Sequence, residues 1–334
     1  MNKRIIQVGL GAMGRYWAQV VRQHPTWEPV AYVDIDQNNL VQAAHEVGMD
    51  ENFCFSDLDE ALTKVEADAL LDITPPDAHE KVSTTALKAG LHVLVEKPLA
   101  DSLAAARRVI QVANENHKIF MVNQDYRFRL VPRTLCKLLN QGTIGKVGFV
   151  DVEFYKGPRF PGNFRESMDF PLLTDMCIHH FDLMRYLLQT DAKSIYVKSF
   201  QPSWSWFRGD SSVAMIIEMQ NGTVITYGGS WVTKGNETPW CGNWRIEGEK
   251  GGLYWYDEKA YRSGQEAPLD SNELVQMSRT GIEYALDEFY QAIAENKEPE
   301  TSGRDNIKSL AMVFAAVDSA KSDRKVQLRS YLPE

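Results

Sequence analysis

Short apolar runs alternate with amphipathic segments in the first 123 residues of the chain. The runs predict strands over residues 4–8, 29–34, 69–74, 92–96 and 119–123. The spacing of apolar positions between them predicts helices near residues 12–24, 38–47, 57–64, 78–89 and 101–117. Because strands that alternate with helices form parallel sheets covered on both faces, we predict an α/β fold with a doubly wound parallel sheet.

The pattern changes after residue 123, where strands follow one another without helices between them. They are predicted over residues 147–155, 194–200, 213–219, 223–231 and 243–247. Asn221-Gly222 is a strong hairpin signal, so this part is expected to be an α+β domain on a mostly antiparallel sheet, with terminal helices over 281–296 and 303–322. Since 334 residues exceed a typical single domain, we expect domains at 1–122 and 123–334.

The first predicted strand leads into a glycine-rich turn and a helix. Gly9, Gly11 and Gly14 form the G-x-G-x-x-G pattern of dinucleotide-binding proteins. Gly9 permits a tight turn, Gly11 lets a pyrophosphate approach the backbone, and Gly14 allows close helix packing. The first helical residues, Ala12 and Met13, then present the helix N-terminus to the phosphates.

An acidic residue, Asp34, closes the second strand at the distance from the glycines that the dinucleotide pattern requires. Its carboxylate can accept hydrogen bonds from the ribose hydroxyls of NAD and would repel a 2′-phosphate. Ile35 and Asp36 follow, so no arginine stands beside it, although Arg15 remains a candidate partner for a phosphate. We therefore expect NAD rather than NADP.

The third long strand ends in a proline pair at the carboxyl edge of the sheet, where ligands of such folds bind. Thr74, Pro75 and Pro76 are expected to lie against the cofactor. His79 begins the next helix, and two interpretations are open: a contact of the cofactor site, or a polar residue of a first helical turn.

The next strand ends in Glu96-Lys97-Pro98. Pro98 has no backbone N–H with which to continue a ladder, so the strand is expected to end with Lys97 pointing into the crevice. A solvent-exposed lysine is the alternative. Glu96 and Lys97 are both predicted near the cofactor, and Lys97 near the substrate.

One segment of the second domain, residues 174–184, is rich in ionisable groups. Helical spacing groups Asp175, His179 and Asp182 on one face and places His180 on another. An imidazole flanked by carboxylates suits a general base, with Asp182 in a supporting role. A solvated helix face and a metal site of two carboxylates and a histidine are the alternatives.

Composition excludes several classes of protein. The net charge of −9 and the lack of a Lys/Arg cluster argue against a nucleic-acid partner. No apolar run is long enough for a membrane span, and the first strand leaves no room for a signal peptide, so a cytoplasmic protein is expected. The four cysteines are scattered, which indicates neither a disulfide framework nor a zinc site, and no metal is predicted.

Five motifs together resemble the glucose-fructose oxidoreductase, inositol dehydrogenase and MocA family: Gly9-x-Gly11-x-x-Gly14, Ile73-Thr74-Pro75-Pro76-x-x-His79, Glu96-Lys97-Pro98, Tyr126-Arg127-Phe128 and Asp175-x-x-x-His179-x-x-Asp182. The resemblance covers essentially the whole chain. It implies a Rossmann domain, a C-terminal domain with a large open sheet used in oligomers, and reversible oxidation of a sugar or cyclitol carbinol. It also implies that His179 accepts the proton, with Lys97 and Asp175 completing the relay. Two departures concern the pocket shape: Cys177 and residues 170–173 replace glycines that are frequent in the family.

Several further residues of the second domain are predicted to contact substrate, namely Arg127, Tyr155, Lys156, Arg159, Asn163 and Arg165. The arginines suit a carboxylate or sulfonate as well as hydroxyls. Tryptophans 204, 206, 231, 240 and 244 suit stacking on a sugar, but packing within a sheet or a subunit interface is the favoured explanation.

We therefore expect an NAD-dependent dehydrogenase that acts on a sugar, a cyclitol or a derivative and assembles as a homodimer or homotetramer. One alternative is a glycosidase that retains NAD and acts by transient oxidation and elimination. The other is a non-catalytic NAD-dependent or sugar-dependent regulator, against which the presence of both Lys97 and His179 argues.

Overall fold

The computed structural model describes residues 2–332, which divide into two compact units. The first contains the chain up to Asp125 together with Arg279–Ile307, and the second contains Tyr126–Ser278 together with the residues from Lys308 onwards. The segment 279–307 therefore belongs to the first unit, whereas the sequence analysis predicted it as part of a domain spanning 123–334.

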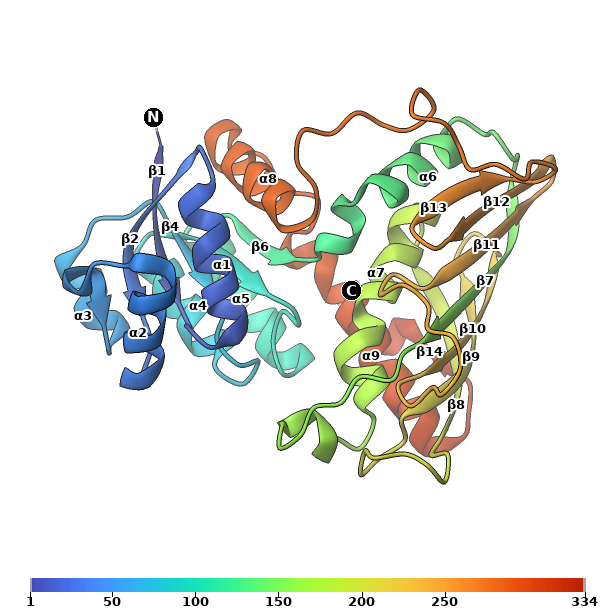
Figure 1. Ribbon diagram of the computed structural model, residues 1–334, viewed down its shortest axis with the longest axis horizontal. Helices are drawn as coiled ribbons and strands as arrows, with labels where there is room; N and C mark the ends of the chain where they lie inside the picture. Colours follow the sequence, from blue (N-terminus) through green and yellow to red (C-terminus); the bar gives the residue numbers. More distant parts are fainter. Residues whose placement is uncertain (1, 333–334) are drawn as a thin grey trace. The chain divides into compact units, whose positions relative to one another are not determined.

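The first unit is built on a six-stranded parallel sheet of order β3-β2-β1-β4-β5-β6 (Figure 1). The strands are β1 (Lys3–Val8), β2 (Trp27–Val33), β3 (Cys54–Phe55), β4 (Ala69–Asp72), β5 (His92–Glu96) and β6 (Phe120–Asn123). The helices are α1 (Ala12–Gln23), α2 (Gln37–Ala43), α3 (Leu58–Lys64), α4 (His79–Lys88), α5 (Leu103–Glu115) and α8 (Gly281–Glu295). The predicted doubly wound sheet is confirmed; β3, which has only two residues, was not predicted.

Helix α8 belongs to the first unit because its apolar face covers an aromatic residue of β2. The Trp27 indole stacks on Phe289 at 5.4 Å and donates a hydrogen bond to the Leu286 carbonyl at 3.1 Å. Beyond α8, the Thr301 hydroxyl donates to the Val122 carbonyl at 2.7 Å, which joins the returning chain to β6. Figure 1 shows α8 in orange beside α1.

The second unit is built on an eight-stranded sheet of order β13-β12-β11-β7-β10-β9-β8-β14. Its strands are β7 (Val147–Tyr155), β8 (Ala192–Phe200), β9 (Ser212–Met219), β10 (Val224–Ser230), β11 (Asn243–Gly248), β12 (Gly251–Tyr256), β13 (Lys259–Arg262) and β14 (Val326–Gln327). Only β7 and β10 pair in parallel, so the predicted mostly antiparallel sheet is confirmed. Strands β12, β13 and β14 were not predicted.

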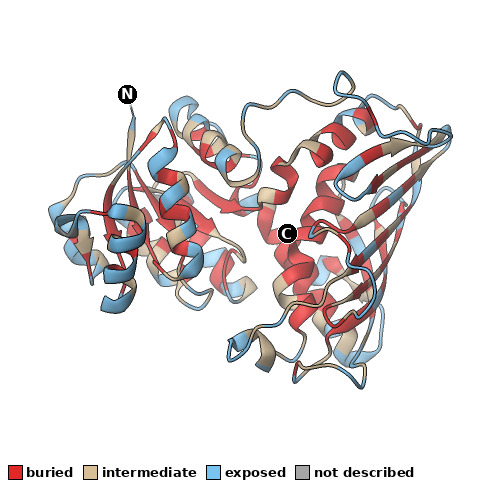
Figure 2. Ribbon diagram, viewed as in Figure 1, coloured by how far each residue is buried: buried red, intermediate tan, exposed pale blue. Residues whose placement is uncertain are grey.

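One face of this sheet is covered and the other is open. Helices α6 (Leu130–Asn140), α7 (Cys177–Leu188) and α9 (Gly303–Ser322) lie on one side (Figure 1). Side chains alternate accordingly along β7, where Val150, Val152 and Phe154 are buried. Every residue from Cys177 to Leu187 is buried, and α7 is red along most of its length in Figure 2. The histidine-bearing helix is therefore an interior element.

Candidate functional site

The three glycines of the fingerprint have different surroundings. Gly9 has a φ of +92°, and a Cβ there would lie 2.5 Å from the Ile73 carbonyl oxygen. A Cβ on Gly14 would lie 2.1 Å from the Gly9 carbonyl oxygen, whereas one on Gly11 would meet no described atom within 4 Å. Helix α1 begins at Ala12, and no side chain among residues 2–332 caps its N-terminus. Gly11 thus leaves open space beside the N-terminus of α1, as a pyrophosphate requires.

Asp34 is buried at the carboxyl end of β2 and holds the glycine turn in place. Its carboxylate accepts hydrogen bonds from the Leu10 amide at 2.7 Å, the Asp36 amide at 2.8 Å and the Asn39 side-chain amide at 3.1 Å. These contacts fix the carboxylate next to the glycine turn, where the ribose of a dinucleotide would lie.

The arginine that sequence reasoning considered for a 2′-phosphate is already engaged. The Arg15 guanidinium donates to Glu46 at 2.7 Å and to the Leu10 carbonyl at 3.1 Å. Binding a phosphate would require Arg15 to exchange this carboxylate for it. In this structure Arg15 is therefore already paired with a carboxylate.

Two apolar side chains beside these groups are exposed. Ile35, which follows Asp34, is 93% exposed, and Met13 in the first turn of α1 is 53% exposed. No role was predicted for Ile35 from the sequence. Its exposure marks it as a surface against which a flat apolar group can pack.

His79 joins the loops that follow β4 and β5. Its Nδ1 lies 2.8 Å from the Pro98 carbonyl oxygen and its Nε2 lies 2.7 Å from the Thr74 carbonyl oxygen. His79 is the first residue of α4, as the first-turn interpretation expected, and it is buried, with 1% of its surface exposed. The ring fixes the backbone of the Thr74-Pro75-Pro76 segment, and its contact with the cofactor stays a prediction.

Glu96 anchors the backbone at Lys97. Its carboxylate accepts hydrogen bonds from the Trp17 indole at 2.7 Å, the Asn123 amide at 2.9 Å and the Lys97 backbone amide at 3.0 Å. Burial raises the pKa of Glu96, against the lowering effect of these donors. Lys97 is half-buried at the end of β5, so the alternative of a fully exposed surface lysine is not what the structure shows.

In the second unit, the segment that carries the predicted base begins with a π-helical turn. This turn spans Leu172–Met176 and contains Asp175, and α7 starts only at Cys177. Asp175 accepts from Arg165 Nε at 2.6 Å and from its Nη2 at 3.4 Å. His179 is 7% exposed and its ring stacks on Tyr126, with centroids 4.3 Å apart and an interplanar angle of 16°.

The predicted polar face of this helix is wrong at Asp182. Its carboxylate is 1% exposed and accepts from Arg127 Nε at 2.8 Å and Arg127 Nη2 at 2.5 Å, and from the Ser309 hydroxyl at 3.2 Å. Since α7 is buried all round, helical spacing alone does not separate a polar from an apolar face. Arg127, predicted to contact substrate, is 5% exposed and belongs to this buried ion pair.

The neighbouring histidine, His180, is a structural residue. Its Nδ1 lies 2.9 Å from the Tyr227 hydroxyl and its Nε2 lies 3.0 Å from the Trp240 carbonyl oxygen. Burial lowers the pKa of His180 to about 4, so the ring is neutral at physiological pH. His179 is therefore the better candidate for proton transfer.

The other predicted substrate contacts have defined surroundings in the second unit. Burial raises the pKa of Tyr155, and the Arg159 guanidinium lies 3.6 Å from the Trp206 ring centroid. Among the tryptophans, Trp231 stacks on Phe207, whereas Trp204 and Trp240 are partly exposed. Packing therefore explains Trp231, as favoured from the sequence.

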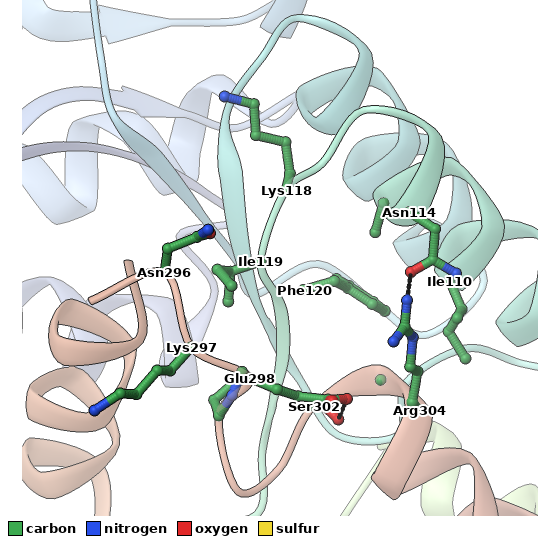
Figure 3. Close-up of a pocket in the computed structure, with 13 residues that line it drawn as sticks. Ile110, Asn114, Lys118, Ile119, Phe120, Asn296, Lys297, Glu298, Ser302 and Arg304 are labelled. Atoms are coloured by element: carbon green, nitrogen blue, oxygen red, sulfur yellow. Dashed lines mark hydrogen bonds between the residues drawn. The ribbon is translucent and has the colours of Figure 1, made fainter. Parts of the chain in front are cut away.

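A separate pocket of about 140 Å³ lies in the first unit at the amino end of β6 (Figure 3). Arg304 and Asn114 hydrogen bond at its wall, and the amines of Lys118 and Lys297 extend away from Ser302. It contains none of the predicted site residues, which follow the carboxyl ends of the strands.

Two further kinds of feature are absent from residues 2–332. In that part of the chain, no group of three or more His, Cys, Asp or Glu side chains is arranged to hold a metal ion. No helix in the same residues is long and apolar enough to cross a membrane.

Comparison with known proteins places these features in a family. Residues 3–124 match the NAD-binding Rossmann-fold domain of the Gfo/Idh/MocA oxidoreductases, and residues 136–328 match the C-terminal alpha/beta domain. A 1,5-anhydro-D-fructose reductase from Ensifer adhaerens is 23% identical over 97% of this chain and 98% of its own. An inositol 2-dehydrogenase from Leifsonia xyli subsp. xyli is 29% identical over 66% of this chain and 65% of its own.

The fold comparison agrees with the sequence comparison. A solved oxidoreductase from Agrobacterium radiobacter, in complex with NAD+, L-tartaric acid and magnesium, superposes with a TM-score of 0.90. It is 20% identical, and the superposition covers 99% of this chain and 100% of that one. Because both characteristic domains are matched over most of its length, the chain belongs to the Gfo/Idh/MocA family of oxidoreductases.

Proposed function

We propose that this protein transfers a hydride between NAD and a carbinol carbon of an uncharged sugar or cyclitol. The observation that carries the proposal is that each unit, taken by itself, holds groups suited to one part of the reaction. The first unit has an open glycine turn at the start of α1. It also has Lys97 at the end of β5, where the Glu96 carboxylate accepts a hydrogen bond from the Lys97 backbone amide. The second has a buried histidine stacked on an aromatic ring, with an ion-paired aspartate on the preceding turn.

The first unit fits NAD at three points. Gly11 and the start of α1 suit the pyrophosphate, Asp34 suits the ribose hydroxyls of the adenosine, and Ile35 offers an apolar surface to the adenine. Thr74, Pro75 and Pro76 are proposed to lie nearer the nicotinamide end. When bound, NAD supplies the hydride acceptor of the reaction.

The side chains of this protein are proposed to accept the carbinol proton and to bind the carbinol oxygen of the substrate. His179 as a neutral imidazole accepts the carbinol proton, since imidazole is the side-chain group that exchanges protons most readily near neutral pH. The Lys97 ammonium holds the same oxygen and stabilises the negative charge that develops on it. Asp175 orients the imidazole, and Arg165 fixes Asp175. In the reverse direction the same groups protonate a reduced ketone.

The cofactor proposal predicts tighter binding of NAD(H) than of NADP(H). Asp34 repels a 2′-phosphate, and Arg15 is occupied by Glu46. The substitution Asp34→Ser should narrow the difference between the two dissociation constants, whereas Asp36→Ser, at an outer turn position, should change it little. Fluorescence titrations with both reduced cofactors measure the difference, and a preference of the native protein for NADPH would refute the assignment.

The charges around the predicted substrate residues favour an uncharged substrate. Three cations there are each neutralised by a carboxylate: Arg165 by Asp175 at 2.6 Å, Lys156 by Glu237 at 2.9 Å and Arg127 by Asp182 at 2.5 Å. A substrate carboxylate that bound one of these three cations would have to displace its partner, which costs the ion pair. A substrate hydroxyl group can instead accept a hydrogen bond from the cation or donate one to the carboxylate, and both leave the ion pair in place.

This argument predicts the outcome of a matched substrate panel. NADH formation should be faster with neutral aldoses or cyclitols than with the corresponding sugar acids, by roughly tenfold or more in kcat/KM, which corresponds to about 1.4 kcal/mol. Glucose with glucuronate and galactose with galacturonate are suitable pairs. Faster oxidation of the acids in both pairs would contradict the proposed substrate class.

We also propose that the open face of the eight-stranded sheet forms the contact between subunits of a homodimer or homotetramer. Phe149 and Val224 are neighbours on paired strands and are 38% and 37% exposed, and Ile216 on the next strand is 53% exposed. Thr226 and Glu218 lie opposite Ile216 and Val224, so the exposed apolar side chains of this face stand among polar ones. Apolar side chains exposed on a sheet face are commonly covered where subunits meet. Light scattering should give at least a dimer, and Phe149→Lys/Ile216→Lys should give monomers. A monomeric native protein at micromolar concentration would overturn the proposal.

A further inference from the structure

The ring that stacks on His179 comes from a distant segment of the second unit. Tyr126 lies in the short helical turn Asp125–Phe128 that precedes α6, and it is 8% exposed. Its ring centroid is 4.3 Å from that of His179, and the planes differ by 16°. This is a near-parallel face-to-face contact between two buried rings.

A guanidinium contacts the same tyrosine. The Arg129 Cζ atom lies 4.0 Å from the Tyr126 ring centroid. One face of a phenol ring has no room for an imidazole and a guanidinium that are both so close to its centroid, so the two groups occupy opposite faces. Arg129 is held in turn by Cys241, whose Sγ atom lies 3.3 Å from Nη1. The order is therefore Arg129, Tyr126, His179.

Stacking on Tyr126 restricts the rotation of the His179 imidazole, which determines where its nitrogens point. An imidazole exchanges protons in the plane of its ring, and rotation about its second side-chain dihedral swings both nitrogens out of that plane. A ring stacked on one face blocks this rotation and leaves the ring edge, which carries both nitrogens, available for hydrogen bonds. The negative face of a phenol also tolerates the imidazolium that forms when the proton arrives.

We infer that Tyr126 is a positioning residue for His179, and that Arg129 holds Tyr126 in place. The inference rests on the proposed function, in which His179 takes the carbinol proton. It adds two residues whose side chains act through the base rather than on substrate or cofactor. Their effect is accordingly expected on turnover and not on the binding of either ligand.

The test compares substitutions that keep or remove the ring. Tyr126→Phe retains the stack and should keep kcat within about threefold, whereas Tyr126→Leu should lower kcat by roughly 10- to 100-fold, the scale of a base misplaced by up to an ångström. KM and the NADH dissociation constant should change by less than about threefold in both, because a positioning residue contributes little to ground-state binding. Phe128→Leu is the control, since it removes a fully buried aromatic residue of the same turn.

A spectroscopic signal separates positioning from general stability. The carbon-bound protons of the His179 ring should be shifted upfield by the tyrosine ring current in the native protein and in Tyr126→Phe. The shift should be lost in Tyr126→Leu and kept in Phe128→Leu, as measured on histidine-labelled protein and assigned with His179→Ala. If Tyr126→Leu does not fold, Arg129→Met decides the question, with an expected severalfold loss of kcat and a smaller ring-current shift.

The possible failures are distinguishable. If His179→Ala is inactive while Tyr126→Leu keeps native kcat, or while Arg129→Met does so where the leucine variant does not fold, the inference is wrong and the proposed function stands. If His179→Ala itself keeps native kcat, both are wrong. An equal loss of kcat in Tyr126→Phe and Tyr126→Leu would also overturn the inference, because it would assign the effect to the hydroxyl group.

Discussion

His179→Ala should lower turnover by roughly two to four orders of magnitude, the range for general acid–base catalysis. Alanine removes the group that accepts the carbinol proton, and the neighbouring His180 cannot replace it, because its nitrogens face Tyr227 and Trp240. Steady-state NADH formation measures the loss. NADH binding, measured by fluorescence, should remain close to native, since the dinucleotide fingerprint lies in the other unit.

Lys97→Ala should cause a loss of similar size for a different reason. The ammonium stabilises the charge that develops on the substrate oxygen, so its removal raises the barrier without removing the base. Lys118→Ala is a matched control, because Lys118 lies at the amino end of β6 and belongs to the separate pocket. His180→Gln is the control for His179→Ala. It should lower the stability of the protein and leave the turnover of the folded protein near native.

Two results would reassign the chemistry. Near-native turnover of His179→Ala in the presence of a chelator would move the base elsewhere, with Lys97 and Tyr155 the next candidates. Tyr155 is the weaker of these, because burial raises its pKa and so disfavours the phenolate that would accept a proton. Loss of activity with a chelator, and its recovery with Zn²⁺ or Mn²⁺, would instead indicate a metal-dependent reaction with a ligand set other than Asp175, His179 and Asp182, because Asp182 is paired with Arg127.

The second large effect is expected on stability. Arg127→Met should lower the free energy of unfolding by about 3–5 kcal/mol, because it leaves the Asp182 carboxylate buried without its cation. The two side chains are 6% and 1% exposed, so water cannot take the place of the guanidinium. Urea denaturation of the native and variant proteins, followed by circular dichroism, measures the difference.

A double variant provides the control for this prediction. Arg127→Met/Asp182→Leu removes both charges and should recover much of the lost stability, because a buried ion pair exchanged for apolar side chains of similar volume is often tolerated. If Arg127→Met alone costs less than about 1 kcal/mol, the pair has the strength of an exposed surface salt bridge, and the buried placement of Arg127 is wrong.

The sequence predicted the first unit well because its strands are buried on both faces. Runs such as residues 92–96 have no polar alternation, and the prolines and glycines that follow them mark the carboxyl edge. Residues 54–55 were missed, since two residues carry no periodicity. The placement of α8 also escaped prediction, because an amphipathic helix does not specify which surface it covers, and Trp27 lies far from Phe289 in the sequence.

The candidate site was predicted less completely. His179 and Asp175 were found through their chemistry, but the π-helical turn that contains Asp175 changes its phase relative to His179 and Asp182, which both lie in α7. Only the tertiary structure pairs Asp182 with Arg127 and stacks Tyr126 on His179. A tyrosine in a short turn carries no local signal of its future partner, so sequence reasoning assigned it no function.

The central claim, hydride transfer to NAD from a carbinol carbon, is tested most directly with a deuterated substrate. A neutral sugar or cyclitol from the panel, labelled at the oxidised carbon, should yield free NADH that carries the deuterium, in one-to-one proportion to the ketone formed. Glycoside cleavage with NAD retained and no net NADH would support the redox-assisted glycosidase instead. Binding of NAD and sugar without turnover on any substrate of the panel would contradict catalysis and favour the regulatory alternative.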